Sequence, residues 1–420
     1  MTLRDRLSPR NLLNSRVNPI FDLFPAVIAL IAGMLVASIL LIALKVDPLD
    51  AFSAMKDGAI GNENATAETL VKAIPIMFVA IGITIAFRGG VINIGGEGQM
   101  IVGALAGTAA AIVIKDSLGA LVIPISLLTG FLAGGLYGGL AGFLKAYFDV
   151  NEILSTIMLN QIAAQLMNYL LNGVMLDPEA GAANNIPKTA RIVGQAELPR
   201  LSFTVPHIFV DILEPIGVIS DPNIFDRTRL HWGLIIALVL ALVIFVFLWR
   251  TPVGYRIRAV GQNERAARYA GINVKRQMVL SMFLAGGFAG LAGSVQVLGL
   301  QYRLQTDGSP AGFTGNAGFN GIVAALFGGL NPIGAMPASV FFGGLLVGAQ
   351  KMQRELGVSA SLITAINGTL VIFVVSSQLF IRRRAKRRVS GGPPVSEIED
   401  VHEEIYSEEP SPLKAEAKST

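Results

Sequence analysis

Residues 232–249, with the sequence WGLIIALVLALVIFVFLW, decide the class of fold, because this run contains no charged side chain. A helix needs about 20 apolar residues to cross the hydrocarbon core of a membrane, where every backbone amide must be hydrogen-bonded within the protein. Residues 26–44 form a second uncharged run of the same kind. The sequence therefore predicts an all-α integral membrane protein.

Other apolar segments repeat this pattern along the chain. The uncharged run between Asp307 and Lys351 is too long for one span, and NPIG at residues 331–334 divides it into a short piece, 317–330, and a fuller one, 332–350. The alternative for the short piece is a re-entrant segment instead of a full crossing. The remaining predicted spans, which bring the total to about ten, are 67–87, 91–114, 117–144, 153–173, 278–300 and 358–381.

The composition excludes several functional classes. Of the 420 residues 52% are hydrophobic and 15% are charged, whereas a soluble domain is about a quarter charged. The chain has no cysteine, only three histidines that lie far apart in sequence, and no phosphate-binding loop of the GxxxxGKS or GxxxxGKT form. We therefore expect no catalytic residues, no metal, no cofactor bound by this chain and no nucleic-acid polymer as partner. The remaining classes are transporter, channel and membrane scaffold.

The basic residues predict the orientation, because they concentrate on the cytoplasmic side of a membrane protein. Four arginines lie in residues 1–25, seven basic residues lie in 250–276, and six open the segment 382–420. We expect these three segments in the cytoplasm, with 26–381 as the transmembrane domain and 174–230 as its external loop. The rest of the C-terminal segment carries eight acidic residues and four prolines and is predicted to be disordered.

One cytoplasmic segment, TPVGYRIRAVGQNERAARYAGINVKR at residues 251–276, has the signals of a short helix. Asn263 is a good N-cap, Glu264 lies where the helix dipole favours an anion, and Gly271 suits the position after the last turn. These signals predict a helix over residues 264–270.

The side chains of this helix suggest a docking role. Ala266, Ala267 and Ala270 lie on one small-residue side that could enter a groove on another protein, with Arg265 and Arg268 at its rim. The alternative is an interfacial segment whose arginines meet the anionic lipids of the membrane.

A second notable segment is GGVINIGGEGQM at residues 89–100. Each glycine costs a helix about 1 kcal/mol relative to alanine, so this stretch predicts a broken helix, which persists at membrane depth where it lines a cavity. Asn93, Glu97 and Gln99 are then candidates for the solute path. The alternative is that Arg88 and Glu97 pair to stabilise a turn on the cytosolic side.

Further polar residues occur inside apolar segments. Asn160 lies within the predicted span 153–173, and Asn316 and Asn320 open the short segment before NPIG. We include all three as candidates for the solute path, with hydrogen bonding between helices as the alternative for Asn160.

Glycines also recur at every fourth position of one predicted span, in GFLAGGLYGGLAG. Such spacing lets two helix backbones approach closely, which is how membrane helices associate without a hydrophobic driving force between them. We expect packing within the chain, and an interface with a partner subunit is the alternative. The glycines are Gly130, Gly134, Gly138 and Gly142.

Three motifs resemble bacterial ABC importer permeases of the branched-chain amino acid, simple sugar and nucleoside group. The stretch GGVINIGGEGQM is most similar to the nucleoside branch, and GFNGIVAALFGGLNPIG is a looser match. The segment 251–276 resembles the coupling loop of these permeases, and we use that name for it. Its matching residues are Thr251, Gly254, Arg258, Ala259, Gly261, Asn263, Ala266, Ala267, Gly271 and Ile272.

The resemblance runs in order over roughly residues 20–385 and implies a permease in the bacterial plasma membrane. Two permeases would pair, separate ATPase subunits would use ATP, and an extracytoplasmic lipoprotein would deliver the solute. The coupling loop would sit in an ATPase groove. The motifs favour nucleosides over simple sugars or branched-chain amino acids, and the alternative from a different class is a secondary transporter or channel that works without an ATPase.

Overall fold

The structure is a computed structural model that describes residues 19–43, 45–114, 117, 119–178, 186–192, 194–201 and 228–359, with separate residues between 362 and 376. Residues 33–375 form one compact unit, which is the subject below. Most of the predicted span 358–381, of the terminal segments and of the 174–230 loop lies outside the described residues.

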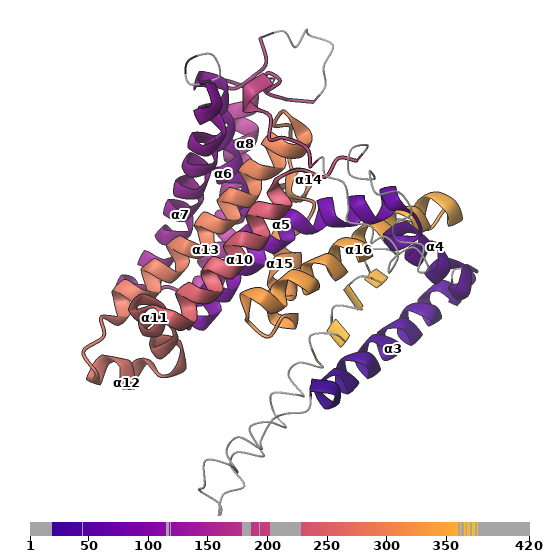
Figure 1. Cartoon of the computed structure of the whole chain (residues 1–420), viewed down its shortest axis with the longest axis horizontal. Helices are drawn as coiled ribbons and strands as arrows, with labels where there is room; N and C mark the ends of the chain where they lie inside the picture. The colour runs from indigo at the N-terminus through magenta and orange to yellow at the C-terminus, as the bar shows by residue number, and fades with distance from the viewer. Residues whose placement is uncertain are drawn as a thin grey trace, which may run out of the picture. The chain divides into compact units, whose positions relative to one another are not determined.

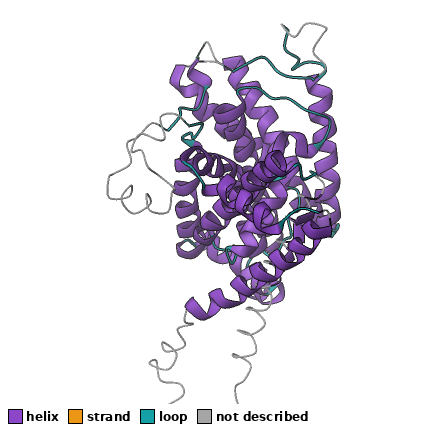
Figure 2. Cartoon of the chain, turned by 90° about the vertical axis from the view of Figure 1, so that its right-hand side faces the viewer, coloured by secondary structure: helices purple, strands orange, loops and turns teal. Residues whose placement is uncertain are grey.

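Within the described part of the chain the elements are helices, joined by loops and two isolated bridges (Figure 2). The all-α prediction is confirmed. The long helices are α3 (Pro19–Ala43), α5 (Glu63–Arg88), α6 (Gly96–Ile114), α7 (Val122–Phe148), α8 (Glu152–Leu171), α10 (Gly233–Arg250), α13 (Val274–Gln296) and α16 (Pro332–Leu356). The shorter elements are α4 (Pro48–Ile60), η1 (Gly119–Leu121), η2 (Gly194–Ala196), α11 (Pro252–Gln262), α12 (Glu264–Tyr269), the π turn η5 (Val297–Gln301), α14 (Pro310–Thr314) and α15 (Ala317–Phe327).

The described residues give a count of candidate membrane spans that can be compared with the predicted one. Among the described residues six helices are long and apolar enough to cross a membrane, or seven if α3 and α4 form one bent span. The count of about ten is therefore not confirmed. The short segment 317–330 contains only the 11 residues of α15, about 16 Å at 1.5 Å per residue. This length favours the re-entrant alternative.

The centre of the unit is α13, which packs against α7, α6 and α5 (Figure 1). Glycine makes the closest of these contacts possible: a Cβ built on Gly134 of α7 would lie 2.6 Å from the Cα of Gly290 on α13, and one on Gly138 would lie 2.9 Å from the Cα of Gly286. The predicted glycine stripe therefore packs inside the chain, as expected for membrane helices.

Several connections meet at one end of this unit. The coupling loop joins α10 to α13 there, and the loop of residues 89–95 between α5 and α6, which we call the glycine loop, lies against it. The turn between α7 and α8 is close by, since the Lys275 ammonium lies 5.0 Å from the ring of Tyr147. We call this the glycine-loop end.

At the opposite end, the described parts of the 174–230 loop pack on the end of α13. The Leu198 amide donates to the carbonyl of Leu298 at 2.8 Å, and the Ile192 amide donates to that of Tyr302 at 2.7 Å. These bonds hold the loop over the π turn.

Candidate functional site

The coupling loop begins with a sharp change of direction after α10. Thr251 is the N-cap of α11: its hydroxyl accepts from the Gly254 amide at 3.1 Å and donates to the Phe247 carbonyl at 2.7 Å. Pro252 follows at the first helical position, where its missing N–H costs nothing. The sequence thus ends one helix and starts the next without a flexible linker.

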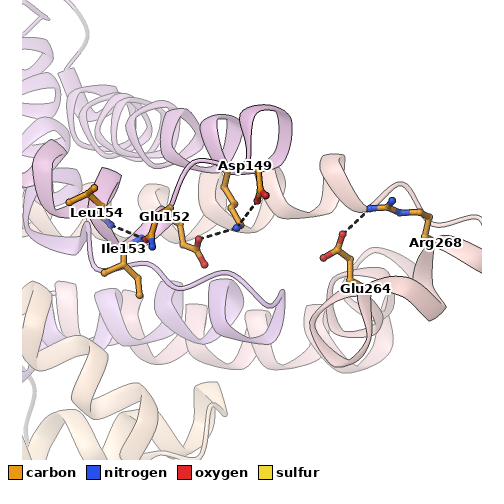
Figure 3. A network of polar contacts seen from close by, with 8 residues as sticks. Asp149, Glu152, Ile153, Leu154, Glu264 and Arg268 are labelled. Atoms are coloured by element: carbon orange, nitrogen blue, oxygen red, sulfur yellow. Dashed lines mark hydrogen bonds and ion pairs between the residues drawn. The ribbon is translucent and has the colours of Figure 1, made fainter.

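The predicted helix of the coupling loop is confirmed, over Glu264–Tyr269 instead of 264–270. The Asn263 carboxamide accepts from the Ala266 amide at 3.0 Å, and Gly271, with φ of +75°, ends the turn. Glu264 and Arg268 form an ion pair at 2.9 Å on the exposed surface (Figure 3). The caps named from the sequence are therefore the ones that delimit α12.

The exposed face of α12 differs from the predicted one. Ala267 is 4% exposed and packs with Val260 and Val274, so it anchors α12 to the neighbouring helices instead of facing outward. One side of this six-residue helix must pack against the rest of the unit. The apolar cluster of Val260, Ala267 and Val274 places Ala267 on that side. Ala266 and Arg265 are exposed, as predicted.

The most exposed large side chain here was missed in the sequence. Tyr269 is 94% exposed. Aromatic residues are enriched at interfaces between proteins, so such an exposed ring is a candidate contact for a partner. An aromatic residue in a capped helix of the coupling loop is the signal that could have identified it. Tyr269, Arg265 and Arg268 together offer an aromatic and basic surface.

The coupling loop touches the glycine loop through bare backbone. A Cβ built on Gly90 would lie 2.9 Å from the Cα of Gly261, and one on Gly261 would lie 2.7 Å from the Gly90 nitrogen and would strike the Arg88 carbonyl. Gly90 also has φ of +78°, which favours glycine. A displacement of α11 at this point therefore meets the glycine loop directly.

A tryptophan links the same two regions a second time. The guanidinium groups of Arg88 and Arg258 lie 5.3 Å and 5.6 Å from the ring of Trp249, within the range of cation–π attraction. Arg258 also donates to the Leu248 carbonyl at 2.9 Å. The end of α10 is thus held between the coupling loop and the end of α5.

Three of the predicted path residues form one buried hydrogen-bonded cluster behind the glycine loop. Asn93 and Gln99 bond each other through both amide groups, at 2.9 Å and 3.0 Å. Asn160 of α8 donates to the Ile94 carbonyl at 3.0 Å and accepts from the Gly98 amide at 2.8 Å. All three are at most 4% exposed, so in this conformation they shape the loop and do not face a solute.

Glu97 has a different role, because it contacts the start of α15. Its carboxylate accepts from the Phe319 amide at 3.1 Å, and a Cβ on Gly318 would lie 2.8 Å from that carboxylate oxygen. The Thr314 side chain also interacts with the carboxyl group, while the second oxygen, Oε2, lacks a hydrogen-bond partner. A carboxylate at this position suits the positive end of the α15 dipole.

Arg88 lies at the other end of the same short helix. It donates to the Leu330 carbonyl at 2.9 Å and the Gly329 carbonyl at 3.3 Å, just after α15 ends. The structure therefore does not support the sequence alternative in which Arg88 and Glu97 pair with each other, because the two side chains bond to opposite ends of α15.

The two remaining path candidates are more accessible. Asn316 precedes α15 in a left-handed conformation, with φ of +61°, and is exposed, while Asn320 is partly exposed. The six candidates therefore divide into four buried residues and two open ones. In the described part of the chain no group of three or more His, Asp or Glu side chains could hold a metal ion.

Comparisons with known proteins agree with this arrangement. A model of the family described as branched-chain amino acid transport system, permease component, matches residues 65–377. A glucose ABC transporter permease protein of Haloferax volcanii is 33% identical over 85% of this chain and 88% of its own length. A guanosine ABC transporter permease protein of Bacillus subtilis is 33% identical over 89% of this chain and 99% of its own.

A nucleoside ABC transporter permease protein of Lactococcus lactis is 28% identical over 83% of this chain and 89% of its own length. No solved structure matches the chain. The family model covers both the glycine loop and the coupling loop, and the resemblance read from their motifs is confirmed. The chain is therefore a multi-pass membrane protein that belongs to the family of branched-chain amino acid transport system permease components.

Proposed function

We propose that the chain is the membrane subunit of an ATP-driven importer for nucleosides in a bacterial plasma membrane. Separate ATPase subunits bind α12, a second permease completes the translocation path, and an extracytoplasmic lipoprotein delivers the solute. Two of the relatives named above are a guanosine and a nucleoside permease, which supports this choice of solute. The chain itself binds no ATP in this proposal, and its two termini are cytoplasmic.

The observation that carries the proposal is the backbone contact between Gly261 and Gly90. An ATPase that pulls or pushes the coupling loop moves α11 as a capped, packed unit, because Ala267 fastens α12 to α11 and α13. Because the backbones of Gly261 and Gly90 are in contact, a movement of α11 then displaces the glycine loop. Since Glu97 at the start of α6 bonds to α15, the motion reaches the short helix beside the solute path.

The docking step is tested by replacing the exposed aromatic side chain of α12. Tyr269→Ala removes a contact of the kind that costs more than about 2 kcal/mol at interface hot spots, so we expect co-purification of the ATPase to fall by about tenfold or more. Tyr169→Ala is the control, because Tyr169 is 73% exposed on α8, near the opposite end of the unit. Equal ATPase recovery from both variants would remove α12 from the docking site.

The solute is tested by uptake in cells with and without this chain, with guanosine as the labelled substrate and unlabelled nucleosides, glucose, ribose and leucine as competitors. We expect nucleosides to compete and leucine to have no effect. Competition by glucose alone would instead favour a sugar permease, the second candidate, which the Haloferax relative supports. Full uptake without any ATPase would identify a secondary transporter or channel and end the proposal.

A further inference from the structure

A cavity of about 190 Å³ lies away from the glycine loop, between α5, the π turn after α13, α14 and α16. It is near the opposite end of the unit, where the described parts of the 174–230 loop bond to the end of α13. Its polar lining consists of Lys72, His231, Gln296, Gln301, Thr314 and Gln350. None of these residues was singled out in the sequence as a candidate for the solute path.

Two of the lining residues carry unsatisfied acceptors. The amide oxygens of Gln296 and Gln301 are out of reach of solvent and have no hydrogen-bond partner. Gln296 is 9% exposed, and its amide nitrogen is fixed by a 2.7 Å bond to the Phe313 carbonyl. A buried acceptor without a donor costs about 1–3 kcal/mol. Two such groups, on residues that line one cavity, indicate a site that is completed by a donor from outside the chain when the side chains turn toward it.

The π turn explains how these two side chains come to line the same cavity. Residues five apart point about 140° away from each other on an α-helix, which advances 100° per residue. The turn Val297–Gln301 has the wider i to i+5 hydrogen bonding, closed by the Tyr302 amide on the Val297 carbonyl at 2.8 Å. This rotates Gln301 back toward the side of Gln296. Such turns inside helices occur frequently at functional sites.

The remaining buried groups of the lining are neutral. Burial lowers the pKa of His231 to about 4, so its imidazole is uncharged at neutral pH. Its Nδ1 accepts from the Gly233 amide at 3.1 Å, which assigns the ring proton to Nε2. Lys72, the one cation in the lining, is partly exposed. The buried wall therefore suits an uncharged ligand with several hydrogen-bond donors.

The cavity also adjoins the site described above. Thr314 belongs to its lining, and the same side chain interacts with the carboxyl group of Glu97. A ligand in the cavity is therefore one side chain away from the contact between α6 and α15. This places the cavity where a solute could be passed toward the glycine loop.

We propose that this cavity is a binding site for a neutral, hydroxyl-rich group, such as the sugar moiety of a nucleoside, held by the amide oxygens of Gln296 and Gln301. The proposal rests on the proposed importer function and names the part of the solute that the permease recognises. The volume lies below the roughly 300 Å³ at which sites for drug-sized ligands begin, so it fits a sugar-sized group. Hydroxyls supply the donors that both oxygens lack.

The test uses the complete importer complex in proteoliposomes with the Gln301→Met and Gln296→Met variants. These replacements keep side-chain length and remove the acceptor. We expect the KM for guanosine uptake to rise about tenfold or more, while ATPase recovery and solute-independent ATP hydrolysis stay unchanged. Gln195→Met is the control, since Gln195 is exposed in η2 and lies outside the cavity lining.

Two further readouts separate this site from a structural role and from the importer proposal itself. The amide oxygen of Gln301 is unpaired, so Gln301→Met should not lower the melting temperature of the complex. If the glutamine had a purely structural role, its replacement would lower the melting temperature. Equilibrium binding of labelled guanosine, labelled glucose and labelled leucine to the nucleotide-free complex tests the site without transport. Unchanged KM and unchanged binding in both variants would overturn the cavity assignment, and a parent complex that binds leucine instead would overturn it together with the importer proposal.

Discussion

Glycine backbones meet at two places in this molecule, and the two contacts differ in what surrounds them. Where α7 crosses α13, Gly134 and Gly290 lie in the middle of continuous hydrogen-bonded helices. Where the coupling loop meets the glycine loop, Gly261 is the next-to-last residue of α11 and Gly90 has left the helical conformation altogether. The first contact joins two rods, helices without a break, and the second joins the end of a helix to a loop.

This difference teaches that close glycine packing serves two purposes here. Between rods it replaces the hydrophobic driving force that membrane helices lack, so its loss should be felt in folding. Between loops it removes any compressible side chain from the contact, so its loss should be felt in the transmission of movement. Each of the following substitutions tests one side of this comparison.

The largest effect is expected for Gly134→Ala, because the new methyl would lie 2.6 Å from the Cα of Gly290 and 2.5 Å from the Gly286 carbonyl. Neither backbone can yield without separating the helices, and overpacking of this kind costs about 1–3 kcal/mol or more. We expect a lower melting temperature and poor recovery of dispersed protein in detergent. Gly139→Ala on the same helix, whose methyl meets nothing nearer than 3.6 Å, should be stable.

A smaller effect, confined to function, is expected for Gly261→Ala. The methyl would strike the Arg88 carbonyl and force α11 away from the glycine loop. Coupling between distant sites is typically worth about 1–3 kcal/mol, so uptake should fall by about tenfold while the ATPase remains bound and continues to hydrolyse ATP. Gln262→Ala, at the exposed neighbouring position, is the control. If uptake and hydrolysis fell together, the contact would be part of assembly instead of transmission.

The smallest effect is expected for Trp249→Leu, which removes the ring between Arg88 and Arg258 but leaves the backbone contact intact. Cation–π contacts contribute about 0.5–2 kcal/mol each, and part of the link survives, so uptake should fall about threefold to tenfold. Trp232→Leu, just before the other end of α10, should transport normally. A loss larger than that of Gly261→Ala would make the tryptophan, and not the glycines, the main connection.

The sequence predicts the features of this site that depend on neighbouring residues. Asn263 and Gly271 cap α12 within one residue of the predicted bounds, because capping uses hydrogen bonds to the next few amides. The break after Arg88 follows from local glycine content in the same way. Apolar length located most spans, although polar side chains such as Asn160 leave α8 outside the set of helices apolar enough to cross alone.

Features that depend on distant residues could not be predicted. Ala267 faces inward because Val260 and Val274 close over it, which the helix pattern of six residues cannot reveal. Glu97 and Arg88 are nine positions apart and suggest a pair, yet their partners are more than 200 positions away in sequence. The two unpaired amide oxygens of Gln296 and Gln301 depend on a π turn that no sequence signal announced.

The length of α15 has a consequence for how this helix is kept at its depth. Most transmembrane helices stay in place because both of their ends reach water, but eleven residues cannot do so. Its position is instead fixed by hydrogen bonds at both ends, to the Glu97 carboxyl group in its first turn and to the Arg88 guanidinium just after its last turn, both supplied by the hairpin of α5 and α6. A movement of that hairpin therefore moves α15 with it, because both ends of the short helix are bonded to the hairpin.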